Sequence, residues 1–386
     1  MHRSDVRPPA DDRSSRPAAL PAAPPAAPHD ADVPYLVALT AVDGVGPRRL
    51  RDLATAFGGA AAAWRAEPAA LARVVPAEVA AAIAAAQRTR SPEAAMAAVA
   101  ACGAQVVVLG DADYPPLLAE TATPPYVLFV RGDAAALRAP AVAVVGTRAA
   151  TAYGREATWR IVAPLARQGV AVVSGLALGI DAAAHEAALE AGGTTVAVVA
   201  GGIDGVYPPR HAALHARIVA AGCVVSEYAP GVAPTAGRFP ARNRVIAGLA
   251  LATVVVEAGD QSGALITAGC AADEGRDVLA VPGPITGAAS RGTHRLIAAG
   301  AALATSADDV LAVLDLDRRA ADADARAGLP DDPAEARLAA TLSAVPAAAD
   351  ELGRRTGLDA ATVGRALAML ELKGRARSGG GRWTAA

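Results

Sequence analysis

Short apolar runs alternate with longer stretches of helical composition through the middle of the chain. These runs are rich in Val and Ala and fall at 106–109, 126–130, 142–145, 170–173, 196–199, 224–225, 252–256 and 278–281. Strands buried on both faces show such runs, and strands that alternate with helices pair in parallel. The pattern predicts an α/β fold over residues 101–316: an extended Rossmann-like parallel sheet with helices on both faces.

The pattern changes on either side of this segment. Residues 33–100 have helical composition, and Gly44-Val45-Gly46-Pro47 is followed by Arg48 and Arg49, which predicts a helical domain of the helix-hairpin-helix or SAM-like type. Residues 334–386 suggest a helix, a turn, a second helix and two strands, a winged-helix pattern. Residues 1–32, rich in Pro and Ala, predict a disordered tail, and residues 317–333 predict a linker.

Charge and side-chain chemistry exclude several classes of protein. The 386 residues carry 36 Lys and Arg against 38 Asp and Glu, so nucleic-acid binding would have to come from a local cluster. Lys373 is the single lysine, which leaves the central segment without a Gly-Lys-Ser/Thr phosphate loop or a Schiff-base amine. We therefore expect no enzyme of those classes.

Cysteine and apolar spacing point to a reducing, aqueous compartment. Cys102, Cys223 and Cys270 lie far apart in apolar settings, without the CxxC spacing of a metal or redox site. The longest apolar run, 245–256, is interrupted by Gly248 and is shorter than the ~20 residues that cross a bilayer. The expectation is a cytoplasmic protein with no metal, cofactor or membrane segment.

Glycine-rich turns follow the predicted strands, at the edge of a parallel sheet where ligands collect. Four of them are Gly146-Thr147-Arg148, 174–181, Ala200-Gly201-Gly202 and 257–263. Glycine allows close approach of a ligand to the backbone, and the helix N-termini that follow favour an anion. Ser262, Gly263 and Thr267 add hydroxyl donors, although they equally fit a simple helix cap. The implied ligand is a phosphate-bearing chain or a nucleotide.

One local cluster is richer than the rest: Arg238-Phe239-Pro240-Ala241-Arg242-Asn243-Arg244. Guanidinium groups fork to phosphates, and a phenylalanine face can stack on an unpaired base. The alternative is a solvated loop in which Phe239 anchors to the core and the arginines pair with Glu227 or Glu257.

Taken in order, these segments resemble the DNA-processing protein A (DprA, Smf) family. The resemblance spans about residues 106–316 and rests on Gly146-Thr147-Arg148, Ser174-Gly175-Leu176-Ala177-Leu178-Gly179-Ile180-Asp181, Ala184-His185, Tyr207-Pro208, Ser226-Glu227, Phe239-Pro240-Ala241-Arg242-Asn243-Arg244, Ser262-Gly263-Ala264-Leu265-Ile266-Thr267 and Val281-Pro282-Gly283. It implies a non-enzymatic homodimer that binds single-stranded DNA without sequence preference and loads a RecA-type recombinase in natural transformation or recombination.

Site residues follow from the resemblance by position. DNA contacts are expected at Arg148, Arg238, Phe239, Arg242, Asn243 and Arg244. A phosphate pocket is expected from Gly146, Thr147, Ser174, Gly175, Gly202, Ser262, Gly263 and Thr267. Independently of the resemblance, Arg48 and Arg49 are expected to add an accessory DNA contact, because the glycine-rich turn before them exposes N–H groups that can hold a phosphate. A plain helical turn that serves only for packing is an equal alternative. Arg238 stands where lysine is frequent in the family, a change that keeps the charge but alters its geometry.

Three alternatives remain at this stage. A nucleoside monophosphate phosphoribohydrolase would use Glu227 and Glu257 as acids, but the chain lacks the Pro-Gly-Gly-x-Gly-Thr run of such enzymes. His211 and His215 have the i, i+4 spacing of metal ligands but no third ligand nearby, so we expect them on the exposed side of a helix. Asp181 and His185, also one turn apart, lack a nucleophile, so a helix cap hydrogen-bonded to His185 is expected.

The winged helix has its own alternative, a regulator that reads duplex DNA with the helix at 361–372. That helix offers only Arg365 before Glu371, which is little for base-edge recognition. Basic side chains on the wing are suited to phosphate contacts, which carry no sequence information: Lys373, Arg375, Arg377 and Arg382. An accessory DNA or protein contact fits better than a repressor, with a solvated basic wing as the other possibility.

Overall fold

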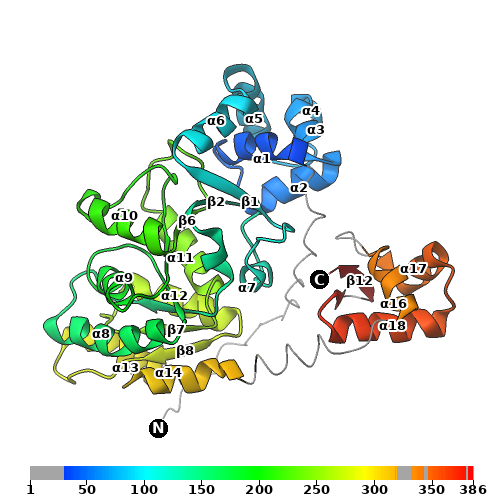
Figure 1. Ribbon diagram of the computed structural model, residues 1–386. Coiled ribbons are helices and arrows are strands. Elements are labelled where there is room, and N and C mark those ends of the chain that lie inside the picture. Colours follow the sequence, from blue (N-terminus) through cyan, green and yellow to red (C-terminus); the bar gives the residue numbers. More distant parts are fainter. Residues whose placement is uncertain (1–29, 318, 320–331, 343–346, 380, 386) are drawn as a thin grey trace, which may run out of the picture.

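A computed structural model describes residues 30–317, 319, 332–342, 347–379 and 381–385. The predicted tail and linker fall largely outside these residues. The described chain forms an N-terminal helical domain, a central α/β domain and a C-terminal winged helix (Figure 1).

The central domain is built on a sheet whose nine strands, among the described residues, follow the order β1-β2-β6-β5-β4-β3-β7-β8-β9. The strands are Ala104–Val108 (β1), Val127–Gly132 (β2), Ala141–Val145 (β3), Ala171–Ser174 (β4), Thr195–Val198 (β5), Cys223–Ser226 (β6), Ala252–Val255 (β7), Asp277–Ala280 (β8) and Ala302–Leu303 (β9). All neighbours from β6 to β9 pair in parallel. Each of the eight predicted apolar runs overlaps one of the strands β1 to β8.

One edge of the sheet departs from the prediction of parallel pairing. β1 pairs antiparallel with β2, and β2 pairs antiparallel with β6. An apolar run shows that a strand is buried but does not show its direction, which is set by the connections between strands. β9 was not predicted, because its two residues are both exposed and too few to form an apolar run.

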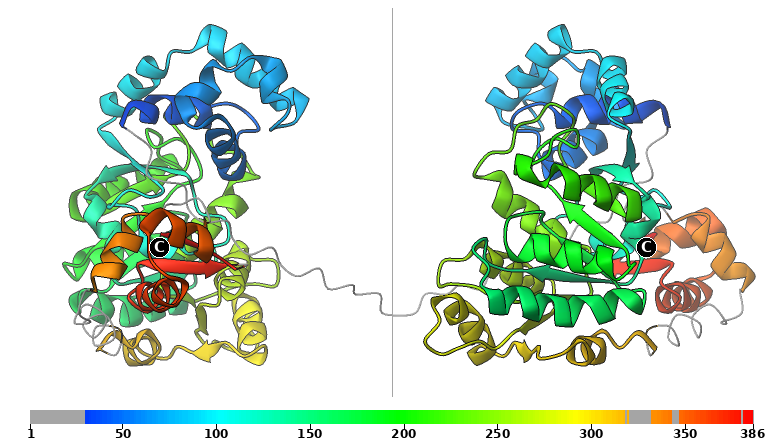
Figure 2. Two further views of the ribbon diagram at one scale, coloured as in Figure 1. Left: turned by 90° about the vertical axis from the view of Figure 1, so that its right-hand side faces the viewer. Right: turned by 60° about the vertical axis from the view of Figure 1, so that its left-hand side comes forward.

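Helices cover both faces of the sheet, as predicted (Figure 2). The helices of this domain are Pro116–Ala119 (α7), Ala152–Arg167 (α8), Ile180–Glu190 (α9), Ala212–Ala221 (α10), Arg238–Gly248 (α11), Gly263–Asp273 (α12), Arg291–Ala298 (α13) and Ala307–Leu314 (α14). Successive side chains of β3 point to opposite faces. Val142 and Val144 pack in a core with α8, α9 and α14, whereas Ala143 and Val145 belong to a second core with α11 and α12.

The N-terminal domain sits over the β1–β2 edge of the sheet (Figures 1 and 2). Its helices are Val33–Thr40 (α1), Pro47–Phe57 (α2), Ala60–Arg65 (α3), Pro68–Leu71 (α4), Ala77–Thr89 (α5) and Pro92–Ala101 (α6). Leu50 and Leu53 of α2 are buried. Gly44, with φ +84°, lies in the turn between α1 and α2, where the sequence predicted the glycine turn of a helix-hairpin-helix.

The C-terminal unit is a winged helix. Its elements are Pro333–Ala339 (α16), Ala347–Ala348 (β10), Ala349–Thr356 (α17), Ala360–Leu372 (α18), Ala376–Gly379 (β11) and Arg382–Ala385 (β12), with the strands in the order β10-β12-β11. Lys373 is not available on the wing surface, because its ammonium pairs with Glu335 at 2.5 Å and both side chains are at most 5% exposed. Arg377 pairs with Glu120 of the α/β domain at 3.5 Å.

In the described part of the chain, no helix combines the length and the apolar character needed to cross a bilayer.

Candidate nucleic-acid interface

The sheet places a cavity of about 680 Å³ where the strand order reverses, between β3 and β7. Open parallel sheets bind ligands at this point, outside the carboxyl ends of the strands. The cavity is lined by Val145, Gly146, Thr147, Arg148, Ala177, Asp181, Ala236, Phe239, Pro240, Arg242, Asn243, Ile246, Gly259, Gln261, Ser262, Gly263, Ala264, Ile266 and Thr267. Most of the predicted site residues therefore share one concave surface.

The turn after β3 is rigid, and it holds Arg148 at the cavity. Thr147 donates its N–H to the carbonyl of Glu257 at 2.7 Å and accepts from the N–H of Ile180 at 3.1 Å. A Cβ at Gly146 would lie 2.5 Å from Ile180 Cγ1, so only glycine fits between the two turns. Arg148 itself is exposed, and its charge is available to a ligand.

Phe239 lies at the centre of an aromatic and cationic cluster. The Arg148 guanidinium carbon is 5.4 Å from the centre of the Phe239 ring, and the Tyr207 ring centre is 5.7 Å from it on a plane tilted by 54°. Tyr207 is 52% exposed. Sequence reasoning did not include Tyr207 among the site residues, although an aromatic side chain beside a glycine-rich loop was the available signal.

A smaller cavity of about 170 Å³ adjoins the first and shares Phe239 and Arg242 with it. It contains two of the predicted pocket residues, Gly175 and Gly202. Ser174 lines neither cavity, because it is fully buried and donates its hydroxyl to the carbonyl of Val144 at 2.6 Å. Its role in this structure is to join β4 to β3.

Arg242 is a buried residue that lines both cavities. Its side chain comes from α11, only 5% of the residue is exposed, and Nη1 donates to the carbonyls of Gly175 and Val198. Burial lowers its pKa to about 10, with help from Arg148 and against the attraction of Asp181. The guanidinium therefore stays charged at neutral pH while it ties the end of β5 and the turn after β4 to α11.

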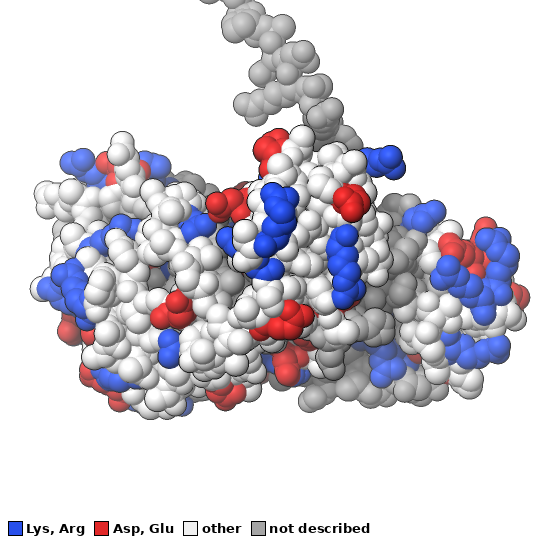
Figure 3. Space-filling model, turned by 90° about the horizontal axis from the view of Figure 1, so that it is seen from above, with Lys and Arg blue, Asp and Glu red and all other residues white. Residues whose placement is uncertain are grey.

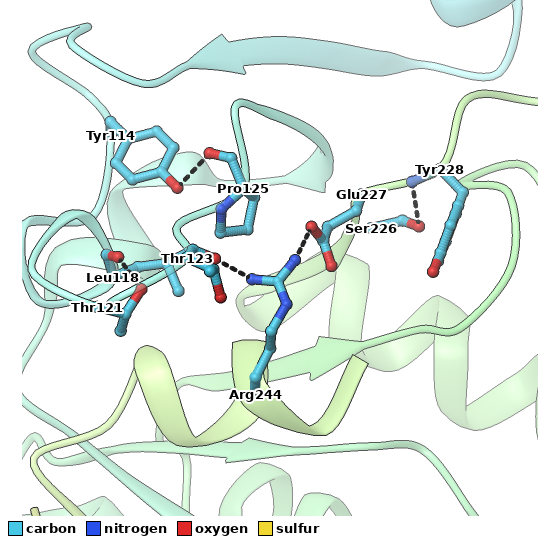
Figure 4. A network of polar contacts seen from close by, with 9 residues as sticks. All are labelled: Tyr114, Leu118, Thr121, Thr123, Pro125, Ser226, Glu227, Tyr228 and Arg244. Carbon is cyan, nitrogen blue, oxygen red and sulfur yellow. Dashed lines mark hydrogen bonds and ion pairs between the residues drawn. The ribbon is translucent and has the colours of Figure 1, made fainter. Parts of the chain in front are cut away.

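Arg244 lines neither cavity, and Figure 4 shows its guanidinium directed toward Glu227 and the carbonyl of Thr123. Its guanidinium pairs with Glu227 and donates to the carbonyl of Thr123 at 2.6 Å. Burial raises the pKa of Glu227, and the charge of Arg244 opposes that rise. The structure thus shows the carboxylate pairing that was the alternative for this arginine.

The other two polar residues of α11 lie on different sides. Asn243 is 8% exposed, lines the cavity and donates its amide to the carbonyl of Gly263 at 3.3 Å. Arg238 lines a separate groove together with Arg48 and Arg49. The predicted DNA-contact residues of α11 therefore separate: Phe239, Arg242 and Asn243 line the cavity, whereas Arg238 lines the groove.

The turn before α12 combines a helix cap with an open backbone. Ser262 is the N-cap and accepts from the N–H of Ala264 at 3.4 Å, as the capping alternative expects. Apart from the chain neighbours and the backbone of α12 itself, no heavy atom lies within 4 Å of a Cβ built on Gly263, so a ligand can approach the backbone here. Thr267, one turn later, is nearly buried and lines the same cavity.

The acids of the hydrolase alternative do not face the cavity. Glu257 is 3% exposed and accepts hydrogen bonds from the N–H and hydroxyl of Thr151 at 2.9 and 2.6 Å. Glu227 is committed to Arg244. Asp181 is the one carboxylate in the lining, and burial raises its pKa against the opposing charge of Arg242.

The histidines differ from expectation in their surroundings. His215, expected on an exposed face, is 4% exposed, and Nδ1 of His211 bonds the carbonyl of Leu176 at 3.0 Å. His185 bonds Thr195 at 2.7 Å rather than Asp181, which accepts from the N–H of Ala177 at 3.3 Å. Among the described residues, no three His, Cys, Asp or Glu side chains gather as a metal site would require.

Charge is dispersed on one face of the molecule. On the face seen in Figure 3, basic and acidic side chains are interspersed with uncharged surface. On this face, attraction for an anion therefore comes from local groups rather than from a continuous basic surface.

Comparison with known proteins gives consistent matches. Residues 105–315 match the model of the DNA recombination-mediator protein A family, and residues 321–382 match the DprA winged helix domain. A Mycobacterium tuberculosis relative named as a DNA processing protein DprA is 48% identical over 247 residues, which cover 63% of this chain and 64% of that protein. The chain thus spans slightly less than two thirds of that relative's length.

Two solved structures share the fold. The DNA processing protein A of Streptococcus pneumoniae matches with a TM-score of 0.64 and 35% identity, over 72% of this chain and 95% of that one. The Helicobacter pylori protein, described as having a unique single-stranded DNA binding mode, matches with a TM-score of 0.50 and 29% identity, over 55% of this chain and 97% of that one.

Proposed function

The chain belongs to the DNA recombination-mediator protein A family, and on that premise we propose that it binds single-stranded DNA without sequence preference at the cavity beyond β3. The observation that carries the proposal is the cluster of exposed Arg148, half-buried Phe239 and exposed Tyr207, in which Phe239 lines both adjoining cavities, Arg148 the larger one and Tyr207 the smaller one. A guanidinium neutralises phosphate, and aromatic faces stack on bases.

The same grouping favours a single strand over a duplex. Bases in a duplex already stack on each other, so an aromatic face can reach only an unpaired base. Every base has a π-face, so stacking on Phe239 or Tyr207 tolerates any sequence. The open backbone at Gly263 adds an approach for a phosphate near the N-terminus of α12.

Within this proposal the arginines of α11 have separate roles. Arg242 supplies a fixed positive charge and holds the glycine turn after β4 in place, while Asn243 holds the turn before α12. Arg244 supports the position of α11 through Glu227 and does not contact the strand. Thr147, Gly175, Gly202, Ser262 and Thr267 line the two adjoining cavities, where phosphates and bases would lie.

Further parts of the proposed function rest on family membership. We propose that the chain acts in the cytoplasm as a non-enzymatic homodimer and passes its strand to a RecA-type recombinase. The family description as a recombination mediator supports the transfer. The engagement of Glu227 and Glu257 with Arg244 and Thr151 supports a binding role, since neither acid is placed to act on a ligand in the cavity.

The direct test is fluorescence anisotropy of a labelled oligonucleotide, single-stranded and then duplex, across a salt series. We expect the wild type to bind the single strand more tightly than the duplex. Phe239→Ala should lose the binding free energy of one stacked base, roughly 1–3 kcal/mol. Arg148→Ala should make the slope of log K against log salt less steep by about 0.7, the value for one phosphate contact on a single strand.

Two substitutions serve as matched controls. Arg167→Ala removes an equal charge from the far end of α8, about 24 Å along the helix axis. Trp159→Ala removes an aromatic side chain from the middle of the same helix. Both should bind as the wild type does. Equal binding of duplex and single strand, or binding indifferent to Phe239 and Arg148, would refute the proposed site.

A further inference from the structure

A groove of about 450 Å³ lies where the N-terminal helical domain meets the α/β domain. The N-terminal domain contributes the end of α1, the glycine turn and the start of α2, and the α/β domain contributes Tyr228, Val232 and Arg238. Neither domain forms this groove alone.

Three arginines from the two domains line the groove. Arg48 is exposed, Arg49 donates from Nη1 to the carbonyl of Gly44 at 2.7 Å, and the Arg238 guanidinium carbon lies 4.8 Å from the centre of the Tyr228 ring. Asp43 is the one carboxylate in the lining. The balance of formal charge in the groove is therefore positive.

The backbone adds to this attraction. α2 begins at Pro47, and its N-cap Gly46 offers no side chain to cap the first turn. The N–H groups of a first helical turn have no acceptor within the helix, and a phosphate can accept from them. Arg48 and Arg49 thus bring side-chain charge and main-chain donors to the same end of the groove.

A single short segment joins this groove to the main cavity. Val232 and Arg238 line the groove, whereas Ala236 and Phe239 line the main cavity. Arg238 and Phe239 are consecutive residues at the start of α11, so this short segment contributes lining residues to both hollows.

We propose that the phosphodiester backbone of the same DNA strand continues from the main cavity across residues 232–238 into this groove, where Arg48, Arg49 and Arg238 hold it. This inference rests on the proposed function of the main cavity and extends it to a second contact on one strand. The two domains share one hydrophobic core that includes Leu39, Leu50, Val225 and Val245, so the groove is a fixed shape.

One strand that occupies both places gains affinity without any new type of contact. Once a strand is held at Phe239, its next phosphates are present at the groove at high effective concentration. A strand too short to reach the groove lacks this gain. The inference therefore predicts a step in affinity with oligonucleotide length, and the step should depend on the groove arginines.

The test compares anisotropy binding of oligothymidines from about 4 to about 16 nucleotides, the range covered by compact single-strand sites. Arg48→Ala/Arg49→Ala should bind the shortest strand as the wild type does and lose the gain with length, so that its long-strand affinity falls to within about twofold of its short-strand affinity. Arg73→Ala/Arg88→Ala is the matched control, because it removes two exposed arginines of the same domain that do not line the groove.

A second measurement needs no variant. A long oligothymidine with one 5-bromodeoxyuridine, moved along the strand, should form a photo-adduct with the peptide that contains Tyr228, whereas the shortest strand should form an adduct only near Phe239. Adducts confined to the Phe239 region at every position would overturn the inference.

The remaining outcomes separate the two proposals. The groove is overturned if the wild type binds short strands but gains no affinity with length. It is also overturned if the groove variant keeps that gain or the control variant loses it. Each of these results leaves the proposal for the main cavity intact. Failure of the wild type to bind any strand overturns both. A polyglutamate peptide whose binding is lost in the groove variant, with the length gain unaffected, would assign the groove to an acidic protein segment instead.

Discussion

At the scale of single residues, burial separates side chains that carry the same charge. Arg148 is exposed, with its guanidinium near a ring that can stack on a base, and it is free to turn toward a phosphate. Arg242 is fixed by two carbonyls and supplies its charge without moving. Preorganised charge of this kind costs no rearrangement when a ligand arrives, so the two arginines complement each other.

His185 provides a residue-scale prediction of pH dependence. Thr195 donates its hydroxyl to the carbonyl of Val172 at 2.7 Å, so Nδ1 of His185 must donate to Thr195 Oγ1, which leaves Nε2 buried without a partner. Burial, followed by the charges of His211 and Arg242, lowers the pKa of His185 from 6.5 to about 3. Between pH 6.5 and about 3, His185 therefore binds a proton in the unfolded chain but not in the folded chain.

The folded state should therefore lose stability as the pH falls from 6.5 toward 3, by up to about 1.4 kcal/mol per pH unit from this one residue. Urea unfolding of the wild type and of His185→Gln across this range isolates the effect, because the raised pKa values of Asp181 and Glu227 act equally in both. Parallel curves of stability against pH for the two proteins would contradict the assignment.

The sequence predicted the positions of some site residues but not of others. The clustering of Arg148 and Phe239 near one glycine-rich edge followed from the order of the motifs, because the ends of parallel strands meet at one edge of a sheet. The burial of Arg242 did not follow, since it depends on the convergence of β4, β5 and α11 in space. Tyr207 reaches Phe239 through a loop whose path no local pattern predicts.

At the scale of elements, α11 distributes its side chains among its neighbours. Consecutive helical residues point about 100° apart, so a run of polar residues spreads around the axis. Arg238 faces the groove, Phe239 the cavities, Arg242 the strand ends and Arg244 the loop that contains Thr123. A cluster in sequence thus becomes a set of contacts in several directions.

The Arg244–Glu227 pair predicts coupled stability rather than a DNA contact. The side chains are 24% and 9% exposed, so Arg244→Met leaves a buried carboxylate without its partner and should destabilise the fold by about 3–5 kcal/mol. Adding Glu227→Gln should recover most of that loss. Chemical unfolding of the two single variants and the double variant measures the coupling.

Binding gives the complementary readout for this pair. At a temperature where the double variant is folded, its affinity for a short single strand should equal that of the wild type. Additive losses of stability would contradict the coupling of the pair. A salt slope reduced by one contact in Arg244→Met/Glu227→Gln would return Arg244 to the DNA interface.

Elements were also the level at which the sequence predicted most. Runs of β-branched residues located β1 to β8 because buried strands need apolar side chains on both faces. The direction of β1 and β2 was missed, because pairing depends on the chain path and not on composition. The helical pattern around Arg238 was also missed, since a polar, proline-containing run is typical of a loop.

At the scale of the whole molecule, the described residues divide into three cores, one of which crosses from the N-terminal domain into the α/β domain. One core contains Leu39 and Leu50 of the N-terminal domain together with Val145 and Val225 of the sheet. Another lies under α8 and α14, on the opposite face of the same sheet. The winged helix has a core of its own around Leu352 and Leu367.

This division predicts how the molecule unfolds. The N-terminal and α/β domains should melt together, and the winged helix should melt as a separate unit. The described contact between Arg377 and Glu120 is an exposed ion pair, with side chains 42% and 53% exposed, and such pairs contribute at most about 1 kcal/mol. It is too weak to couple the two transitions.

Differential scanning calorimetry of two matched variants tests the division. Leu39→Ala and Leu352→Ala each remove a fully buried leucine, at an expected cost of about 2–5 kcal/mol. Leu39→Ala should lower only the larger transition, which would show that the N-terminal helices are held rigidly on the sheet, as the groove between them requires. Leu352→Ala should lower only the smaller transition and leave single-strand affinity unchanged. A third transition that moves with Leu39→Ala alone would mean that the N-terminal helices unfold separately, and the groove would then lack a fixed shape.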